Sequence, residues 1–219
     1  MREIIISKQD VEKSAGADIE LIFSQNDSDI SIEVQEGVMV TLREAIRADV
    51  AAAQILIRIN KGARVVYTCA GPSSEANDTS SLSIQRTVSI SQSGFFRCVQ
   101  PSAQRTAAVD HSHVIFAEDP AQAQGYAASF LSKGAVAELR YTIDHLAPQT
   151  VSLIESRSVG SEHSSLDYLA HIFIKESARG SHATQHHSAL LLSNFASITA
   201  VPELDICEKD VSCTHGVAI

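Results

Sequence analysis

The sequence has few aromatic residues and no tryptophan. Aromatic side chains make up 5% of the 219 residues. A chain so poor in aromatic rings lacks the stacking platforms that proteins use to hold single-stranded nucleic acid. Its core must be aliphatic, since hydrophobic residues of all kinds still reach 44%. That share suffices for a packed interior, and the length favours a single domain over residues 1–219.

Positive charge is also scarce. Lys and Arg number 17 against 26 for Asp and Glu, so the formal net charge is −9. An acidic chain repels the phosphates of nucleic acids and of anionic membranes, which makes both poor partners. No apolar run approaches the length of a membrane span, and residues 1–7 do not resemble a signal peptide. We therefore expect a cytoplasmic protein that binds neither nucleic acid nor membrane.

The four cysteines (Cys69, Cys98, Cys207 and Cys213) form no C-x-x-C pair. A chain of this length does not need disulfides for stability, which predicts reduced thiols. Cys69 and Cys98 lie inside apolar runs that are typical of strands. We interpret these two as small core residues.

The motifs of self-contained catalysis are absent. There is no Gly-rich phosphate loop, G-x-S-x-G, H-E-x-x-H or dinucleotide fingerprint. Asp144 and His145 could suggest an acid–base pair, but adjacent residues on a strand point to opposite faces. A structural or surface role is the better interpretation of that pair, and we predict that the chain is not an enzyme.

Alternation of apolar and polar residues dominates what is present. It predicts many short strands with one buried face each. The alternating sets include Ile19 to Phe23, Ile30 to Val34, Ile55 to Ile59, Leu82 to Ile90, Ala135 to Ile143, Leu166 to Ile174 and Ile198 to Ile206.

Polar residues followed by glycine mark the turns before several of these runs. They are Glu36-Gly37, Lys61-Gly62, Ser93-Gly94 and Lys133-Gly134, and glycine permits the positive φ of a tight corner. The irregular spacing suits a solenoid whose rungs differ in length. A β-sandwich shows the same features, so pattern alone leaves both architectures open.

Two segments depart from the alternation. Residues 41–54 place apolar side chains on one helical face and are rich in alanine, which predicts one short helix. Residues 71–81 are polar and rich in turn formers, which predicts an exposed loop.

The histidines offer two groupings. His182, His186 and His187 follow Gly180, and on a helix the first two would share a face and chelate a metal. Their polar surroundings favour a turn that leads into the strand Leu190–Leu192. His111 and His113 lie two residues apart, so on a strand they face the same way, as residues of a solvated strand edge would.

The most informative stretch is residues 201–216. Cys213 and His215 lie two residues apart, so on a strand both side chains leave the same face. A thiolate and an imidazole together suit iron or zinc, but two ligands cannot complete a metal site. From the residues alone, a structural cysteine and a surface histidine remain an alternative.

The wider pattern resembles the signature of the SufB/SufD family. That signature is matched by Pro202, Leu204, Asp205, Ile206, Asp210, Val211, Cys213, His215 and Gly216. Upstream, Leu190 to Ser193 is similar to a leucine-rich strand of the family. His145, Ala147 and Thr150 match its H-x-A-x-x-T stretch. Thr214 and Gly216 resemble the SufD form.

The resemblance implies an all-β fold, a right-handed parallel β-helix with at most one short helix. It further implies a scaffold or accessory subunit that builds iron–sulfur clusters. The cluster is transient and lies at a dimer interface, where Cys213 and His215 would be metal ligands, with His215 ranked first. The implied partners are a SufB-like subunit or a second copy of the chain. The SufC-type ATPase is not expected, because the chain stops at Ile219 without the family's C-terminal helical segment.

Two alternatives remain. One is a dimerisation or interaction module of the same family that no longer binds clusters. The other is a β-solenoid enzyme acting on polysaccharide, against which the low aromatic content counts. The two family interpretations differ in whether Cys213 and His215 bind metal.

Overall fold

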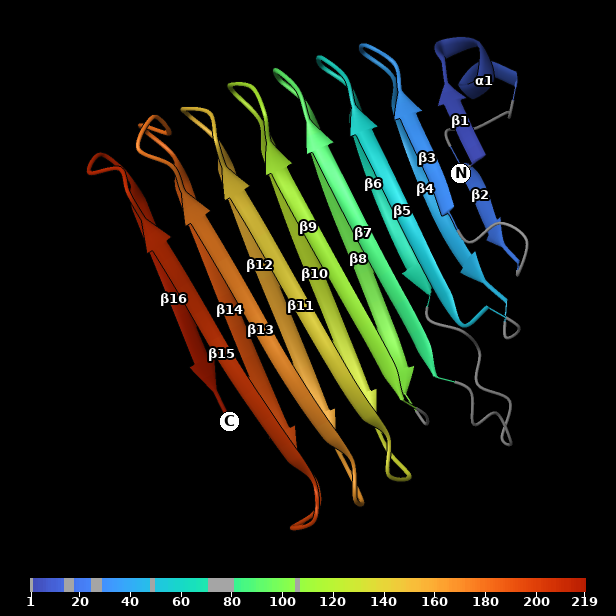
Figure 1. Cartoon of the computed structure of the whole chain (residues 1–219), viewed down its shortest axis with the longest axis vertical. Coiled ribbons are helices and arrows are strands. Elements are labelled where there is room, and N and C mark those ends of the chain that lie inside the picture. The colour runs from blue at the N-terminus through green and yellow to red at the C-terminus, as the bar shows by residue number, and fades with distance from the viewer. Residues whose placement is uncertain (1, 14–17, 25–28, 48–49, 71–80, 105–106) are drawn as a thin grey trace.

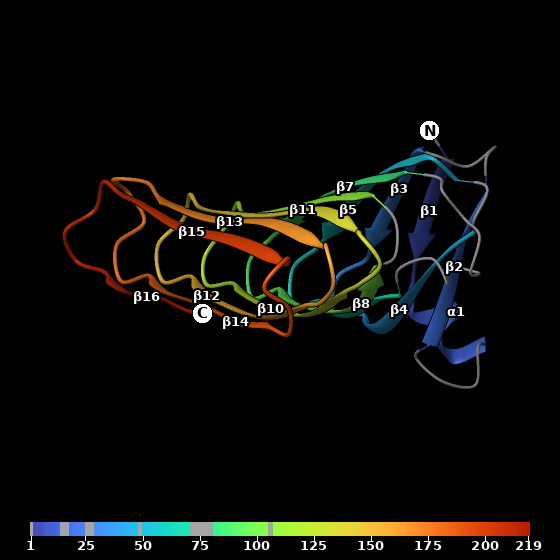
Figure 2. The same ribbon diagram turned by 90° about the horizontal axis from the view of Figure 1, so that it is seen from below.

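The fold is a parallel β-solenoid. The computed structural model describes residues 2–13, 18–24, 29–47, 50–70, 81–104 and 107–219. Successive strands alternate between two eight-stranded sheets, and every ladder is parallel. Figure 1 shows the strands in layers from the N-terminal to the C-terminal end, and Figure 2 shows the two sheets facing each other. The predicted β-helix is confirmed.

The odd-numbered strands form one sheet, called sheet A. Its members in spatial order are β1 (Arg2–Ile6), β3 (Asp29–Val34), β5 (Ala52–Ile59), β7 (Leu82–Ile90), β9 (Ala108–Phe116), β11 (Val136–His145), β13 (Ser165–Ile174) and β15 (Ser197–Ile206).

The even-numbered strands form sheet B. Its members are β2 (Asp18–Phe23), β4 (Met39–Ile46), β6 (Arg64–Ala70), β8 (Phe95–Gln104), β10 (Gln122–Leu131), β12 (Val151–Gly160), β14 (His182–Leu191) and β16 (Ser212–Ala218).

Alternation produces the core because the inward residues of one rung lie on those of the next. Ile30 is in register with Ile55, and Ile32 with Ile57, and all four are buried. Fully burying an aliphatic side chain of this size stabilises the fold by roughly 1.5–3 kcal/mol. Repeated along the solenoid, such stacks form a continuous aliphatic core between the sheets.

The helix predicted at residues 41–54 is wrong. Strand β4 ends at Ile46 and β5 begins at Ala52, so the segment is two strands and a corner. Leu42, Glu44 and Ile46 all point inward and are buried. A buried carboxylate interrupts the apolar period of two, and this made the segment resemble a helix.

The helix of the described residues is α1 (Lys8–Lys13), at the N-terminal end of the solenoid (Figure 2). The Ser7 backbone N–H donates to the Asp10 carboxylate at 2.9 Å, and the Asp10 backbone N–H donates to the Ser7 hydroxyl at 3.4 Å. This is a reciprocal N-terminal cap of the capping-box type. None of the described residues forms a helix long and apolar enough to cross a bilayer.

The predicted glycine corners are all turns. Gly37, Gly62 and Gly134 have φ of 66°, 66° and 77°. Gly94 is needed for a different reason: a Cβ there would lie 2.6 Å from Cγ2 of Ile90 and 2.9 Å from the Ser91 carbonyl oxygen. Of the loop predicted at residues 71–81, positions 71–80 lie outside the described residues.

Candidate functional site

The C-terminal motif lies on the last rung of the solenoid. Strand β16 pairs with β14 and forms the edge of sheet B, and β15 forms the corresponding edge of sheet A (Figure 1). Cys213 is in register with Ala183 and His215 with Gln185, and both partners are buried inward-facing residues. The two motif side chains therefore share the inner face of the terminal rung, as their spacing predicted.

Exposure differs within this pair. Cys213 is half-buried and packs against the core, whereas His215 is exposed. Burial raises the pKa of the Cys213 thiol, and an interaction with the Ala183 backbone works in the opposite direction. Metal binding requires the thiolate, so a metal that binds here must displace a proton.

The pair is not a complete metal site by itself. Within the described ranges, no three His, Cys, Asp or Glu side chains lie close enough together to hold a metal ion. Two ligands on the inner face of an unpaired rung form at most half of a site. Any further ligands must come from outside the described part of the chain.

Other residues of the motif hold the rung in place. Val211 is half-buried against the core. The Gly180 N–H donates to the Asp210 carbonyl at 2.7 Å, which ties the turn before β16 to the rung below. Pro202 lies in β15, where an edge strand tolerates the missing backbone donor.

Gly216 lies beneath a histidine ring. A Cβ at this position would be 3.1 Å from Nδ1 of His186, so only glycine leaves the ring its place without adjustment. The motif glycine is thus explained by packing between β14 and β16.

The turn predicted for His182, His186 and His187 is wrong, because all three lie in strand β14. His182 and His186 are exposed, whereas His187 points into the core. Four residues along a strand span about 13 Å, so His182 and His186 cannot chelate one ion.

The H-x-A-x-x-T stretch builds a corner between the two sheets. His145 is fully buried, with Nδ1 2.7 Å from the Thr150 hydroxyl and Nε2 2.9 Å from the Ser152 hydroxyl. Burial lowers the pKa of His145 to about 4, so the ring is neutral. This supports the structural role expected for the Asp144–His145 pair.

His111 and His113 do face the same way, but not on a strand edge. Strand β9 lies between β7 and β11. His111 Nε2 is 2.9 Å from Glu138, and His113 Nε2 is 2.8 Å from Asp144. Carboxylates of the next rung therefore account for both rings.

A buried ionic network, which the sequence did not reveal, crosses the middle of the solenoid. Arg86 donates to Glu44 at 2.6 and 2.8 Å and to Asp110 at 2.6 Å. Gln100 donates to Asp110, and Tyr67 donates to Glu44. Each of these strands has a polar residue among its inward-facing apolar residues, as β7 has Arg86 between Ile84 and Val88. That interruption is the sequence feature that could have indicated the network.

Burial and the charges of the network shift the pKa values of Asp110 and Arg86. Burial raises the pKa of Asp110, against the opposing effect of Arg86. Burial acts to lower the pKa of Arg86, but the carboxylates of Asp110 and Glu44 outweigh it and raise that pKa. The two carboxylates therefore share one guanidinium, and both depend on it for charge compensation.

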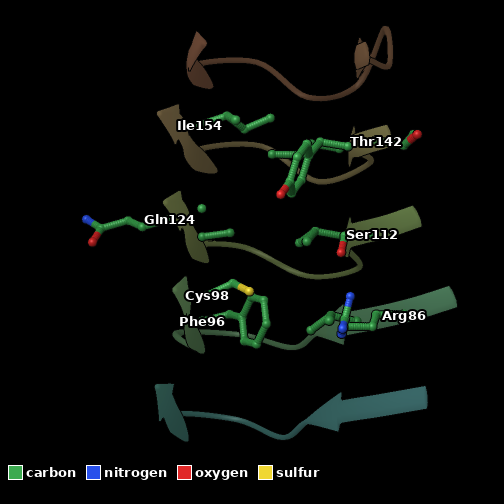
Figure 3. A pocket seen from close by; sticks show the side chains of 13 residues that line it. Arg86, Phe96, Cys98, Ser112, Gln124, Thr142 and Ile154 are labelled. Carbon is green, nitrogen blue, oxygen red and sulfur yellow. The ribbon is translucent and has the colours of Figure 1, made fainter. Parts of the chain in front are cut away.

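A small cavity lies beside the network. Figure 3 shows Phe96 and Cys98 of β8 reaching toward it from one side and Arg86 and Ser112 from the other. Its volume of about 30 Å³ is far below the several hundred Å³ of a typical ligand pocket. Cys98 Sγ also lies 3.7 Å from Cys69 Sγ, and both thiols are buried as predicted.

Comparison of the sequence with known families finds one group of proteins. The family model described as "SUF system FeS cluster assembly, SufBD core domain" matches residues 18–219. The chain therefore belongs to the SufBD core-domain family.

Two curated relatives carry the same family name. An iron–sulfur cluster assembly SufBD family protein of Staphylococcus epidermidis is 23% identical over 194 residues, and one of Staphylococcus saprophyticus is 22% identical over 194 residues. Each alignment covers 86% of this chain and 41% of the relative. The chain thus spans less than half the length of these relatives.

Proposed function

We propose that the chain is a SufD-like scaffold or accessory subunit of iron–sulfur cluster assembly. In this role Cys213 and His215 contribute ligands at a dimer interface, and the cluster is the transient cargo. The observation that carries the proposal is the shared inner face of these two residues on the last described rung, whose outer edge pairs with no other described strand. Thiolate and neutral imidazole are ligand types that iron–sulfur centres accept.

The surface around the terminal rung supports an interface. Eight of the fourteen exposed large apolar side chains in the described ranges lie on or beside the last three strands. They are Leu190, Leu191, Leu192, Phe195, Val201, Ile206, Val217 and Ile219. Exposed large apolar side chains gathered at one end of a fold are typical of interaction sites, and the edge strands β15 and β16 pair with no further strand of the described residues, so they can offer backbone groups to another chain.

The partner in this proposal is a SufB-like subunit or a second copy of the chain. Either one would bring a further set of side chains to the incomplete Cys213–His215 pair. Because the chain binds and passes on a cluster, it performs no covalent catalysis itself.

Anaerobic reconstitution tests the proposal. The purified chain is mixed with iron and sulfide, with and without a SufB-like partner, and the gel-filtered species is examined by visible absorption. We expect charge-transfer bands that weaken in His215→Ala and in Cys213→Ser. His182→Ala is the matched control, because His182 is an exposed histidine of the neighbouring strand that points to the other face.

A second candidate function is a dimerisation module without cluster binding. The eight exposed apolar side chains favour it as much as the first, since they require a partner but no metal. A stable dimer in the same gel-filtration run, with no absorption bands under any condition, would establish this candidate and refute the first.

A further inference from the structure

Buried polar atoms without a partner concentrate near the C-terminal end of the solenoid. Seven buried side-chain nitrogen or oxygen atoms in the described ranges have no hydrogen-bonding partner in the chain, and six of them belong to one neighbourhood. They are the hydroxyls of Ser156, Ser158 and Tyr168, the carbonyl of Gln185, and both ring nitrogens of His187. Native interiors leave few such atoms, and each requires an explanation.

The registers bring these residues together on the inner side of the last rungs. Ser156 of β12 is in register with His187 of β14. The His187 ring stacks on Tyr168 of β13, with centroids 4.1 Å apart. Gln185 lies two residues before His187 and faces inward with it, so groups from sheet B meet Tyr168 of sheet A across the lumen.

Such a group cannot be dry. The hydroxyls of Tyr168 and Ser156 are close enough to interact with each other. The remaining atoms, which include both ring nitrogens of His187, would still carry a desolvation penalty that is large against the stability of an ordinary domain. We infer that Ser156, Ser158, Tyr168, Gln185 and His187 enclose an internal hydrated site that binds ordered water.

Water fits this site better than an ion does. None of the five side chains carries a fixed charge, and burial lowers the pKa of His187 to about 4, which keeps its ring neutral. No triad of metal-binding side chains occurs in the described ranges. Hydroxyls, an amide carbonyl and a neutral imidazole both donate and accept hydrogen bonds, and water does the same.

The site borders the terminal rung. Gln185 is in register with His215, and His187 with Val217. Water held at His187 therefore lies one rung behind the Cys213–His215 pair. The inference does not depend on cluster binding, because none of its five residues belongs to the proposed ligand pair.

Hydrogen–deuterium exchange at the imidazole C2 carbon, measured by mass spectrometry on the native chain, tests access to His187. His145 is the internal control: it is equally buried, but both of its nitrogens have hydrogen-bonding partners. We expect faster exchange at His187 than at His145. Equal rates, both set by global unfolding, would overturn the inference.

A pair of serine variants gives a second readout. Ser152 and Ser158 both point inward from β12 and are 2% exposed, but only Ser152 has a partner, at His145. If Ser158 binds water, Ser158→Ala lowers the melting temperature, as Ser152→Ala does. If the site is dry, Ser158→Ala removes an unpaired hydroxyl and raises the melting temperature, which contradicts the inference.

Discussion

Arg86 and Glu44 lie forty-two residues apart in sequence and are joined by two hydrogen bonds inside the solenoid. Glu44 comes from sheet B and Arg86 from sheet A, so this ion pair connects the two sheets through the lumen. Its side chains are almost completely removed from water. The interior of this solenoid is therefore held by specific polar contacts as well as by aliphatic stacking.

Replacing Arg86 with Met should destabilise the fold by about 3–5 kcal/mol, because Glu44 and Asp110 would be left as buried charges without a partner. Urea unfolding measures the loss. Arg43→Met is the control, since the Arg43–Asp18 pair is largely exposed and should contribute at most about 1 kcal/mol. Similar losses in the two variants would show that the buried network is not essential.

Stability should fall as the pH is lowered from 6.5 to about 4. The pKa of His145 is lowered from 6.5 to about 4 in the folded chain, so the unfolded chain binds more protons across this window. Stability from neutral His145 is present above pH 6.5 and is lost toward pH 4, by about 3 kcal/mol in all.

Denaturant unfolding at several pH values checks this dependence in the native sequence and in His145→Gln. The amide retains hydrogen-bonding capacity but does not titrate, so the variant should be less stable near pH 7 and less sensitive to acid. An unchanged slope in His145→Gln would assign the acid sensitivity to other groups, of which His187 is the first to test.

The terminal rung should separate structural from ligand residues. Val211→Asp places a carboxylate where a half-buried apolar side chain packs on the core, and should cost about 2 kcal/mol or more. His215→Ala changes an exposed side chain and should leave the melting temperature nearly unchanged. Thermal melts distinguish the two, and equal destabilisation would mean that His215 also holds the rung together.

Two glycines should respond in opposite ways to the same substitution. Gly94→Ala places a Cβ 2.9 Å from a backbone oxygen, which cannot move aside cheaply, and should destabilise by more than about 2 kcal/mol. In Gly125→Ala, the new Cβ has only the Leu153 carbonyl oxygen within 4 Å, at 3.9 Å, and it fills part of the small cavity. That variant should be neutral or slightly stabilising. Calorimetry of both provides the comparison.

The sequence predicted the solenoid best where the inward residues are large and aliphatic. Ile55, Ile57 and Ile59 show the period of two clearly, and they are buried as expected. The period is weaker in β12, where Ser152, Ser156 and Ser158 point inward. When the buried face of a strand carries serine, the alternation of apolar and polar residues that predicts a half-buried strand is lost.

The candidate site was predictable in part for a similar reason. The same-face geometry of Cys213 and His215 follows from residue spacing alone, and the structure confirms it. The burial of His187 and the pairing of Arg86 depend on which strands become neighbours; the partners of Arg86 lie 42 and 24 residues away in sequence. No local pattern contains that information.

The parallel stacking of rungs also has a consequence for how this chain can change. Each rung contacts mainly the rungs before and after it, so a substitution near α1 has no direct contact with β16. Neutral substitutions can therefore accumulate independently at the two ends of the solenoid. Sequence divergence as deep as that from the staphylococcal relatives is compatible with an unchanged terminal rung, because selection can act on that rung almost alone.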